Sequence, residues 1–579
     1  MTIAANTSAK NWRITSTDPR AGELARSLKI SNLLAQILIN RGVSSDQTAH
    51  SFLSPKLTEL IAPEQMPGAV AAAKRIRQAL VDNQKISIYG DYDVDGITST
   101  SILWHLLTIL GGNVDYYIPH RVDEGYGLND EAITQLAESG TDLIITVDCG
   151  VTAVAQVDHA KQLGMDIIIS DHHQPGPQLP NADAIVHPGL DGYENPDSAG
   201  AMVAFKLAWT LVNLSRTTAQ TPPQLREFLL NATTLAAIGT IADVVNLTGE
   251  NRILTSFGLK SLAQSEMTGI QALIRTAELE GDELDSYNIA FKLAPMLNAA
   301  GRMGHARLAV DLLTSSSEMQ CYKIAEYLKE QNKLRQQCQR KIYKEARQMI
   351  VNNHLNHPER RTIVVANENW HTGIIGIVAS RIVDDFFRPA IVINTDGQLA
   401  QGSCRSVPGF DLYKALVACA EHLESFGGHE MAAGLKLRID KISDFINAFE
   451  QYARDHIDDE AVKANLDIDA LCTIGELDFN MVKHIKYLEP FGQGNPAPIF
   501  ATKGVHRISP PRRVGAKGDH LQIAISDNTA SVRCIGFGMG KYEKKLLESE
   551  TFSVAYEPQF NTYNGNTTVQ FALKDIQFE

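Results

Sequence analysis

Between residues 85 and 245 the chain alternates short apolar runs with longer amphipathic segments. The short runs are typical of buried strands, and residues 98–110 show the spacing of a helix. This alternation predicts an α/β domain with a largely parallel sheet. The predicted strands are 85–89, 114–118, 143–147, 166–170 and 184–186. Ligands of such sheets gather beyond the carboxyl ends of the strands, so the residues that follow each run are candidates for function.

A long helix is predicted next, because no glycine or proline occurs between Ser315 and His357 and apolar residues recur at helical spacing. At 1.5 Å per residue it would span about 50 Å, so we expect a rigid connector that belongs to neither flanking core. Residues 331–347 carry six basic side chains and a single acidic one. Such a stretch is either a solvated helix face or the wall of a nucleic-acid channel.

The pattern changes twice more after this helix. Residues 361–366 and 390–394 predict strands of a second α/β domain that ends near residue 453. Beyond residue 520, four segments alternate apolar and polar side chains, and Asn564-Gly565 supplies a hairpin turn, so we expect a small antiparallel barrel. The predicted parts are 1–315, the parallel-sheet domain with an N-terminal extension; 316–355, the connecting helix; 356–455, the second α/β domain; and 456–579, the barrel.

Charge narrows the class of protein. The 579 residues carry 53 basic and 67 acidic side chains, a net charge of -14, which excludes a protein that coats nucleic acid by bulk charge. Residues 461–579 hold 13 of each sign, so the excess acid lies upstream of the barrel. The barrel region has five basic residues with no acid between them: Lys503, Arg507, Arg512, Arg513 and Lys517. Its aromatics (Phe500, Phe537, Tyr556, Phe560 and Tyr563) would serve either a single-strand binding face or the core.

The seven cysteines are scattered and never spaced Cys-x-x-Cys, which indicates neither a disulfide framework nor a zinc ribbon. The first residues lack the pattern of a signal peptide, and no stretch approaches the roughly 20 apolar residues of a membrane span. We therefore expect a soluble protein of the reducing cytoplasm with no membrane association.

Three carboxylates follow the first predicted strand, at Asp91, Asp93 and Asp95 in a loop bounded by glycines. Like charges at alternate positions are costly unless a cation neutralises them. A calcium loop is one alternative, but the run lacks the distal glutamate of an EF-hand and lies between a strand and a helix.

Further acids and histidines follow the other strands of the same sheet. Asp148 follows the third strand, His172 and His173 follow the next, and Asp243 lies within an apolar stretch downstream. Oxygen ligands with one or two histidines suit Mn²⁺ or Mg²⁺. Six or seven ligands are too many for one ion, whereas two ions about 3.5–4 Å apart that share a carboxylate would use them all.

The segments that hold these residues resemble, in order and spacing, the four motifs of the DHH phosphoesterase superfamily. They are Tyr-Gly-Asp-Tyr-Asp-Val-Asp-Gly (89–96), Val-Asp-Cys-Gly (147–150), Ser-Asp-His-His (170–173) and Gly-Thr-Ile-Ala-Asp-Val-Val (239–245). The resemblance continues at 119–121, 124–127, 297–303, 402–406 and 426–429 and covers nearly the whole chain beyond the first 50 or so residues. With its C-terminal barrel, the chain is similar to the bacterial single-strand-specific 5′ exonucleases of the superfamily.

The resemblance implies a role for each matching residue. It makes Asp93, Asp95, Asp148, His172 and Asp243 metal ligands, with Asp148 as the bridge, and makes Asp91 a ligand or a supporting acid of the same cluster. It makes His173 the partner of the scissile phosphate. Asn298 and Arg302 would contact the DNA backbone; Arg121, Ser403 and Arg405 would form a pocket for the 5′-terminal phosphate; and His429 would contact substrate from the second domain.

The implied fold is a DHH domain and a DHH-associated domain, both α/β, joined by the long helix and followed by an OB-like barrel. The implied activity is 5′ to 3′ degradation of single-stranded DNA to mononucleotides by two-metal-ion hydrolysis with Mn²⁺ or Mg²⁺, in DNA repair and recombination. The resemblance also implies a monomer that works with single-strand binding protein and a helicase.

Two alternatives remain open. One is a superfamily member that hydrolyses short oligonucleotides, a cyclic dinucleotide or pyrophosphate; the barrel and the basic helix favour a polymer instead. The other is an inert scaffold that binds DNA or replication proteins; the retention of every acid and both histidines argues against it.

Overall fold

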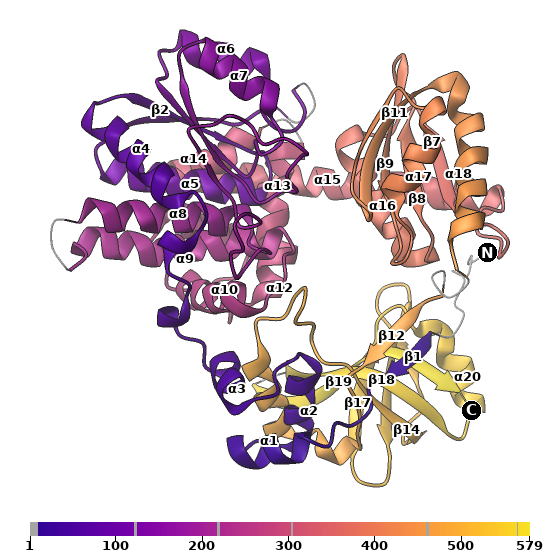
Figure 1. The fold of residues 1–579 in the computed structure, drawn as a ribbon. Coiled ribbons are helices and arrows are strands. Elements are labelled where there is room, and N and C mark those ends of the chain that lie inside the picture. Colours follow the sequence, from indigo (N-terminus) through magenta and orange to yellow (C-terminus); the bar gives the residue numbers. More distant parts are fainter. Residues whose placement is uncertain are drawn as a thin grey trace. The chain divides into compact units, whose positions relative to one another are not determined.

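The computed structural model describes residues 10–120, 124–216, 220–302, 305–458, 463–563 and 565–578 (Figure 1). The chain forms two compact units. One contains residues 55–338 and the short segment 490–495, and the other contains residues up to 54, 339–489 and 496–579. None of the helices in the described part of the chain is both long enough and apolar enough to cross a membrane.

The first unit is built on a five-stranded parallel sheet in the order β3-β2-β4-β5-β6, as the apolar runs predicted. Its strands are β2 (Lys85–Gly90), β3 (Asn113–Tyr117), β4 (Leu143–Val147), β5 (Asp166–Ser170) and β6 (Ala184–Val186). Helices cover both faces, which explains why the central strands β2, β4 and β5 are buried at nearly every position. On one face lie α4 (Ala69–Val81), α5 (Val94–Ile109), α8 (Gly200–Ser215) and α9 (Pro223–Ala242); on the other lie α6 (Asp130–Glu138) and α7 (Val154–Gln162) (Figure 1).

A helical layer completes this unit. It contains α10 (Gly249–Leu262), α11 (Thr268–Thr276), α12 (Ser286–Asn288), α13 (Ala294–Arg302) and α14 (Ala306–Thr314). A π-helical turn over Ile289–Leu293 joins α12 to α13, so that one continuous helical segment runs from Ser286 to Arg302.

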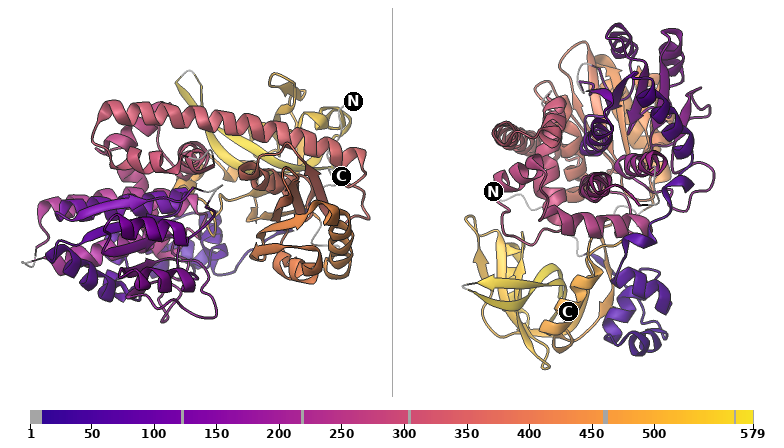
Figure 2. Two further views of the ribbon diagram at one scale, coloured as in Figure 1. Left: turned by 90° about the horizontal axis from the view of Figure 1, so that it is seen from above. Right: turned by 90° about the vertical axis from the view of Figure 1, so that its left-hand side faces the viewer.

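The predicted long helix is α15 (Glu318–Asn352), which is uninterrupted (Figure 2). Cys321, Ala325 and Leu328 of its first half are part of the core of the first unit. In its second half, Ile342 and Ala346 are buried, and Glu345 accepts a hydrogen bond from Trp370 Nε1 at 2.9 Å. The expectation that this helix belongs to neither core is therefore wrong, because each end buries its apolar stripe in the unit that it enters.

The second α/β domain has a five-stranded sheet in the order β10-β11-β9-β8-β7. Only β7 and β8 pair in parallel; the other pairs are antiparallel. The strands are β7 (Ile363–Asn367), β8 (Ala390–Asn394), β9 (Leu399–Arg405), β10 (Ser425–Gly428) and β11 (Ala432–Arg438), and the helices are α16 (Thr372–Phe386), α17 (Leu412–Ala418) and α18 (Ile442–His456).

The C-terminal region forms the predicted barrel in the strand order β13-β14-β18-β19-β17-β16-β15, closed by a β14–β16 pairing. Most pairs are antiparallel, but β13–β14 and β17–β19 are parallel. The strands are β13 (Ala470–Leu471), β14 (Phe500–Arg507), β15 (Arg512–Val514), β16 (His520–Ser526), β17 (Ser531–Gly536), β18 (Phe552–Tyr563) and β19 (Asn566–Phe578). Two short helices accompany them, α19 (Phe479–Ile485) and α20 (Glu543–Glu548).

The aromatic residues singled out in this region divide between core and surface. Phe500 and Tyr556 are fully buried, whereas Phe537 and Tyr563 are 66% and 74% exposed. Arg507, one of the five basic residues, donates to the Leu546 and Ser549 carbonyls and so connects β14 to the end of α20. Asn564 of the predicted turn lies outside the described residues, and Gly565 has a positive φ of 78°.

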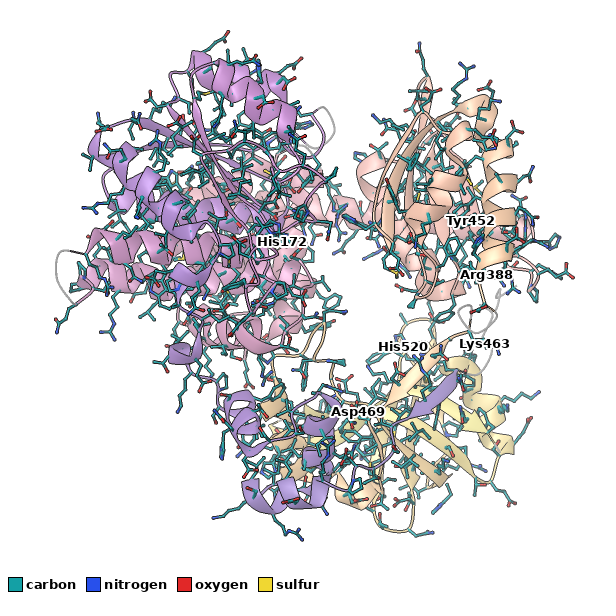
Figure 3. All side chains as sticks on the ribbon, in the orientation of Figure 1. His172, Arg388, Tyr452, Lys463, Asp469 and His520 are labelled. Atoms are coloured by element: carbon teal, nitrogen blue, oxygen red, sulfur yellow. The ribbon has the colours of Figure 1, made fainter. Side chains whose placement is uncertain are left out.

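The N-terminal segment packs on the C-terminal region. Its elements are β1 (Asn11–Ile14), α1 (Ala21–Leu28), α2 (Asn32–Asn40) and α3 (Asp46–Leu53). Strand β1 pairs in parallel with β12 (Asn465–Ile468), and Arg41 forms an ion pair of 2.7 Å with Asp469, which Figure 3 labels. This arrangement differs from the prediction that the segment belongs with the parallel-sheet domain, because its partners lie more than 400 residues away and leave no local pattern.

Candidate metal centre and nucleic-acid contacts

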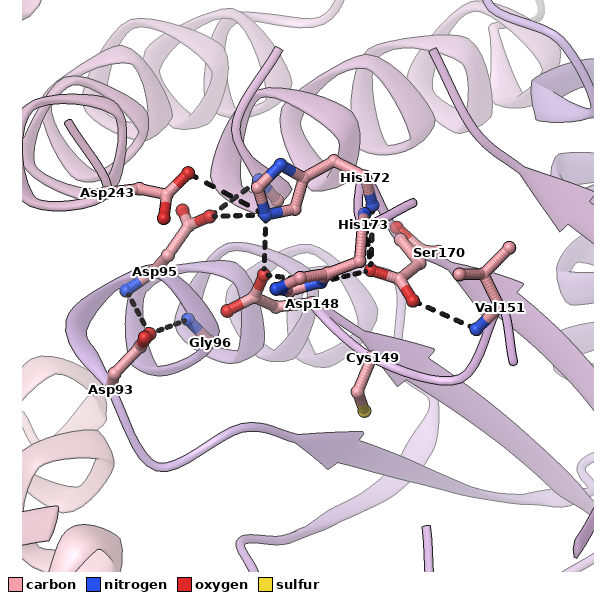
Figure 4. A network of polar contacts seen from close by, with 12 residues as sticks. Asp93, Asp95, Gly96, Asp148, Cys149, Val151, Ser170, His172, His173 and Asp243 are labelled. Atoms are coloured by element: carbon pink, nitrogen blue, oxygen red, sulfur yellow. Dashed lines mark hydrogen bonds and ion pairs between the residues drawn. The ribbon is translucent and has the colours of Figure 1, made fainter. Parts of the chain in front are cut away.

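Seven of the predicted side chains converge at the carboxyl edge of the parallel sheet, and Figure 4 labels all of them except Asp91. They form three groups whose ligand atoms lie within 4.8 Å of one another: Asp91 with Asp93 and Asp148, Asp148 with His172 and His173, and Asp95 with His172 and Asp243. Asp148 and His172 each belong to two groups. This sharing fits two neighbouring cations better than one.

The first carboxylates are positioned by the start of α5. Asp93 is the N-cap of this helix, and its Oδ1 accepts from the backbone N–H groups of Asp95 and Gly96 at 3.0 and 3.2 Å. A Cβ on Gly96 would lie 2.6 Å from the Asp91 carbonyl oxygen, so glycine is required where the loop folds back on the helix. The alternation of acids in the sequence is therefore a capped turn that points several carboxylates into one place.

Asp95 is held by the N-terminus of a second helix. Its carboxylate accepts from the backbone N–H groups of Gly200 and Ala201, the first residues of α8, at 2.6 and 2.8 Å. Burial and the charge of Asp93 nevertheless raise the pKa of Asp95 to about 7. A Cβ on Gly239 would lie 2.6 Å from Asp95 Oδ1, so the glycine that opens the fourth motif leaves room for this carboxylate.

Asp148 lies at the centre of the cluster, in a left-handed conformation with φ of 62°. Its Oδ1 is 3.1 Å from His172 Nε2. Both atoms are buried, and neither is hydrogen-bonded within the described residues. Burial and then the charges of Asp95, Asp93 and Asp91 raise the pKa of Asp148 well above its ordinary value. A divalent cation would satisfy these buried atoms and offset the repulsion, so the donor set fits Mn²⁺ or Mg²⁺.

The pKa values of the two adjacent histidines are shifted in opposite directions. Burial and the neighbouring His173 lower the pKa of His172 to about 4, which leaves its ring neutral and able to donate a lone pair to a metal. Burial also acts to lower the pKa of His173, but its 2.8 Å hydrogen bond to Asp171 and nearby carboxylates raise it to about 9. At neutral pH, His173 is therefore a cation beside the cluster.

Three residues that the sequence analysis did not assign also shape this site. Asp171 accepts from Val151 N, His172 N and the His173 ring, at 2.9, 2.7 and 2.8 Å. Tyr126 Oη lies 3.0 Å from His173 Nδ1. His187 Nε2 donates to the His173 carbonyl at 2.7 Å. Asp171 and Tyr126 stand inside quoted motifs, and His187 directly follows β6, so the strand-end rule would have found it.

Helix α13 carries Asn298 and Arg302, the two residues predicted to contact the DNA backbone. It lies beside residues 91–94, which we call the metal loop. Asn298 Oδ1 accepts from Val94 N at 3.2 Å, which caps α5. A Cβ on Gly301 would overlap the Tyr92 carbonyl oxygen, so α13 packs directly on the loop. Arg302 is the last residue of this helix. Arg121 lies outside the described residues.

Ser403, Arg405 and His429 belong to the second unit. Arg405 Nη1 donates to Ser403 Oγ and to the Cys404 carbonyl at 3.3 and 2.7 Å. Ser403 lines a pocket of about 350 Å³ with Thr372, Gln401 and Lys436 among others. His429 lies between β10 and β11, where its backbone N–H donates to the Ala432 carbonyl at 2.8 Å and its side chain is exposed.

Three family models match the chain in order. They are the DHH family N-terminal domain over residues 85–240, the DHHA1 domain over 360–455 and the RecJ OB domain over 468–575. The single-stranded-DNA-specific exonuclease RecJ of Bacillus subtilis is 37% identical over 573 residues, which cover 98% of this chain and 71% of that protein. The chain belongs to the RecJ family.

Other RecJ proteins match nearly the whole chain in sequence and in fold. RecJ of Escherichia coli is 31% identical over 570 residues, covering 94% of this chain and 95% of that one. The crystal structure of RecJ from Thermus thermophilus in complex with Mn²⁺ superposes with a TM-score of 0.84 at 29% identity, covering 98% of this chain and 80% of that one. A Mg²⁺ complex of the same RecJ gives a TM-score of 0.79.

Proposed function

We propose that the chain is a metal-dependent exonuclease that hydrolyses single-stranded DNA from its 5′ end to mononucleotides. The observation that carries this proposal is the set of three ligand groups at one sheet edge, which share Asp148 and His172. Membership of the RecJ family, whose relatives are named as single-stranded-DNA-specific exonucleases, supports it.

The residues that would hold two Mn²⁺ or Mg²⁺ ions are Asp91, Asp93, Asp95, Asp148, His172 and Asp243. When bound, such ions polarise the phosphodiester as Lewis acids and lower the pKa of the attacking water. The Cys149 thiol beside Asp148 is a poor nucleophile, because burial raises its pKa well above its ordinary value.

His173 and Arg302 would act on the scissile phosphate. The His173 ring is cationic at neutral pH and is fixed in orientation by Asp171. A fixed cation beside the phosphate offsets the charge that grows on its oxygens in the transition state. Arg302, at the end of the helix that packs on the metal loop, would add a second cation.

Polarity would come from groups that bind the terminal phosphate, with Ser403 and Arg405 of the second unit in this role and His429 as a further contact; Arg121 keeps the same predicted role. A terminal phosphate carries more negative charge than an internal phosphodiester, so cationic groups distinguish the end from the middle of a strand. The barrel would hold the strand beyond the cleaved bond.

Replacement of the shared carboxylate tests the proposal. We expect Asp148→Ala to reduce Mn²⁺-dependent release of nucleotides from 5′-phosphorylated single strands by about a thousandfold or more. Asp158→Ala, at an exposed acid of α7, is the matched control and should keep full activity. Nucleotide release by Asp148→Ala at the rate of the control would show that the metal assignment is wrong.

We also propose that the enzyme acts in the cytoplasm in DNA repair and recombination, after a helicase has separated the strands and beside a single-strand binding protein. A nuclease confined to single strands needs another protein to open a duplex. On blunt duplex DNA, addition of a helicase should raise the rate of nucleotide release, and an unchanged rate would contradict this cooperation.

A further inference from the structure

A cleft with a volume of about 340 Å³ lies between α5 and α9 of the first unit, and we call it the α5–α9 cleft. Phe228, Ala232 and Leu235 are buried and form its apolar part, whereas Gln224 and Glu227 are exposed and line its mouth. A cleft of this size, mostly apolar and with a few polar groups, has the character of a small-molecule site. None of these residues belongs to the metal centre.

The polar side chains of this cleft are not used by the protein itself. Gln224, Glu227 and Asn231 recur on one face of α9, and their side chains form no hydrogen bond or ion pair within the described residues. His105 Nε2 donates to the Leu313 carbonyl at 2.9 Å, since a carbonyl can only accept. Burial lowers the pKa of His105, so its ring is neutral at neutral pH and Nδ1 is left as an acceptor. The cleft therefore offers acceptors to the donors of a ligand.

Charge decides which class of ligand fits the cleft. Among the described residues that line it, Glu227 is the only one with a charged side chain at neutral pH. A phosphate or carboxylate would be repelled by Glu227, whereas an ammonium or guanidinium group would be attracted to it and to the face of the Phe228 ring. An organic cation with an apolar body would place its charge at the mouth and its body in the buried part.

The helices that form the cleft carry metal-centre carboxylates at their other ends. Asp95 lies in the first turn of α5, ten residues before His105, and Asp243 is the C-cap of α9, twelve residues after Asn231. At 1.5 Å per residue these separations are about 15 and 18 Å, so an occupant of the cleft is too far away to touch a metal ion. Asp95 and Asp243 nevertheless belong to one ligand group. Their separation therefore depends on how α5 packs against α9.

We infer that the α5–α9 cleft is a regulatory site, which binds an organic cation and thereby changes the affinity of the metal centre for Mn²⁺. This coupling rests on the proposed function, since it takes Asp95 and Asp243 as metal ligands. The coupling is reciprocal, because a cation that changes the affinity for Mn²⁺ by some factor has its own affinity changed by Mn²⁺ by the same factor.

The first test uses the full-length enzyme and three compounds that share an indole ring. Tryptamine carries an ammonium group, tryptophol a hydroxyl and indole-3-propionate a carboxylate. By calorimetric titration, we expect tryptamine to bind about tenfold or more tightly than tryptophol, and indole-3-propionate not to bind. Glu227→Gln should weaken tryptamine binding about tenfold or more. The matched control is Glu266→Gln, at an exposed acid that is next to Met267 in the chain but does not line the cleft.

Mn²⁺ titrations with and without saturating tryptamine measure the coupling. We expect the affinity for Mn²⁺ to change about fivefold or more in the wild type and in Glu266→Gln, and not in Glu227→Gln at the same tryptamine concentration. Absence of tryptamine binding, equal binding of the three compounds, or unweakened tryptamine binding to Glu227→Gln would overturn the site. An affinity for Mn²⁺ that tryptamine leaves unchanged would overturn its regulatory role. Failure of the wild-type enzyme to release nucleotides would refute the proposed function and leave these binding results standing.

Discussion

At the scale of single residues, His187 supports the pair of histidines at the site. Its Nδ1 accepts from Gly189 N at 3.0 Å, and its Nε2 donates to the His173 carbonyl at 2.7 Å. Because Nδ1 accepts a hydrogen bond, the proton of the neutral ring lies on Nε2, which can then donate to the His173 carbonyl. His187 is buried and touches the backbone of the site, so it acts as a positioning residue.

We therefore expect His187→Ala to lower kcat about tenfold to a hundredfold and to weaken Mn²⁺ binding, with little change in KM. His187→Asn, which can still donate a hydrogen bond, should recover part of the loss. Steady-state kinetics and Mn²⁺ titration check both. If His187→Ala lowered the melting temperature but left kcat and Mn²⁺ affinity unchanged, the role would be merely structural.

The convergence of these side chains could be predicted from the sequence because six of the seven stand in short motifs that follow β2, β4 and β5, whereas Asp243 follows helix α9. The supporting roles of Asp171 and Asn298 could not be predicted, because these side chains act by accepting hydrogen bonds from the backbone N–H groups of Val151 and Val94. Hydrogen bonds to the backbone of another segment leave no trace in the side-chain pattern.

At the scale of elements, the loop 490–495 packs on the segment that follows Asp243. Leu247 N donates to the Gln493 carbonyl at 2.8 Å, and Ser286 Oγ donates to the Phe491 carbonyl at 2.5 Å. Gly494 has a φ of 72°, and a Cβ there would lie 2.8 Å from Asn246 Oδ1. This loop precedes the barrel strand β14 in the chain, yet it fixes the turn that follows Asp243, a proposed metal ligand.

Gly494→Ala should therefore weaken Mn²⁺ binding and lower kcat several-fold. The control is Gly504→Ala, because Gly504 has a similar φ of 64° but faces open space, so it carries the same backbone strain without the clash. Equal activity of the two variants would mean that the loop does not position the site.

Strands β4, β5, β6 and β8 coincide with their predicted ranges, because apolar runs bounded by polar residues specify a buried strand locally. The docking of loop 490–495 and of the N-terminal helices could not be predicted in this way. Both depend on partners more than 200 residues distant.

At the scale of the whole molecule, the net charge of -14 includes carboxylates that the fold brings together at the metal centre. Burial and the neighbouring charges raise the pKa of Asp95 to about 7 and that of Asp243 to about 8. The net charge excludes only a protein that coats nucleic acid by bulk charge, whereas the arrangement of the same acids argues for a metal-dependent enzyme.

These shifts predict how stability depends on pH. The folded chain holds protons on Asp95, Asp243 and His173 more tightly than the unfolded chain does, so their contribution to stability is lost as pH rises through about 7 to 9. In chelator, the melting temperature should therefore fall between pH 6 and pH 9. Mn²⁺ replaces these protons, so the stabilisation by Mn²⁺ should be greater at pH 8.5 than at pH 6.

Thermal melts with Mn²⁺ and with chelator at each pH measure both effects. For Asp148→Ala, the rise in melting temperature on addition of Mn²⁺ should be much smaller at either pH. A shift by Mn²⁺ that is larger at pH 6 than at pH 8.5 would contradict the assignment of protonated carboxylates to the metal centre.

The most direct test of the account is a time course on single strands labelled at the 5′ or the 3′ end, with Mn²⁺, Mg²⁺ or chelator. We predict that the 5′ label is released at once as a mononucleotide, that the 3′ label stays on a shortening strand until late, and that chelator abolishes both. Early release of the 3′ label, or degradation in chelator, would contradict a metal-dependent exonuclease that begins at the 5′ end.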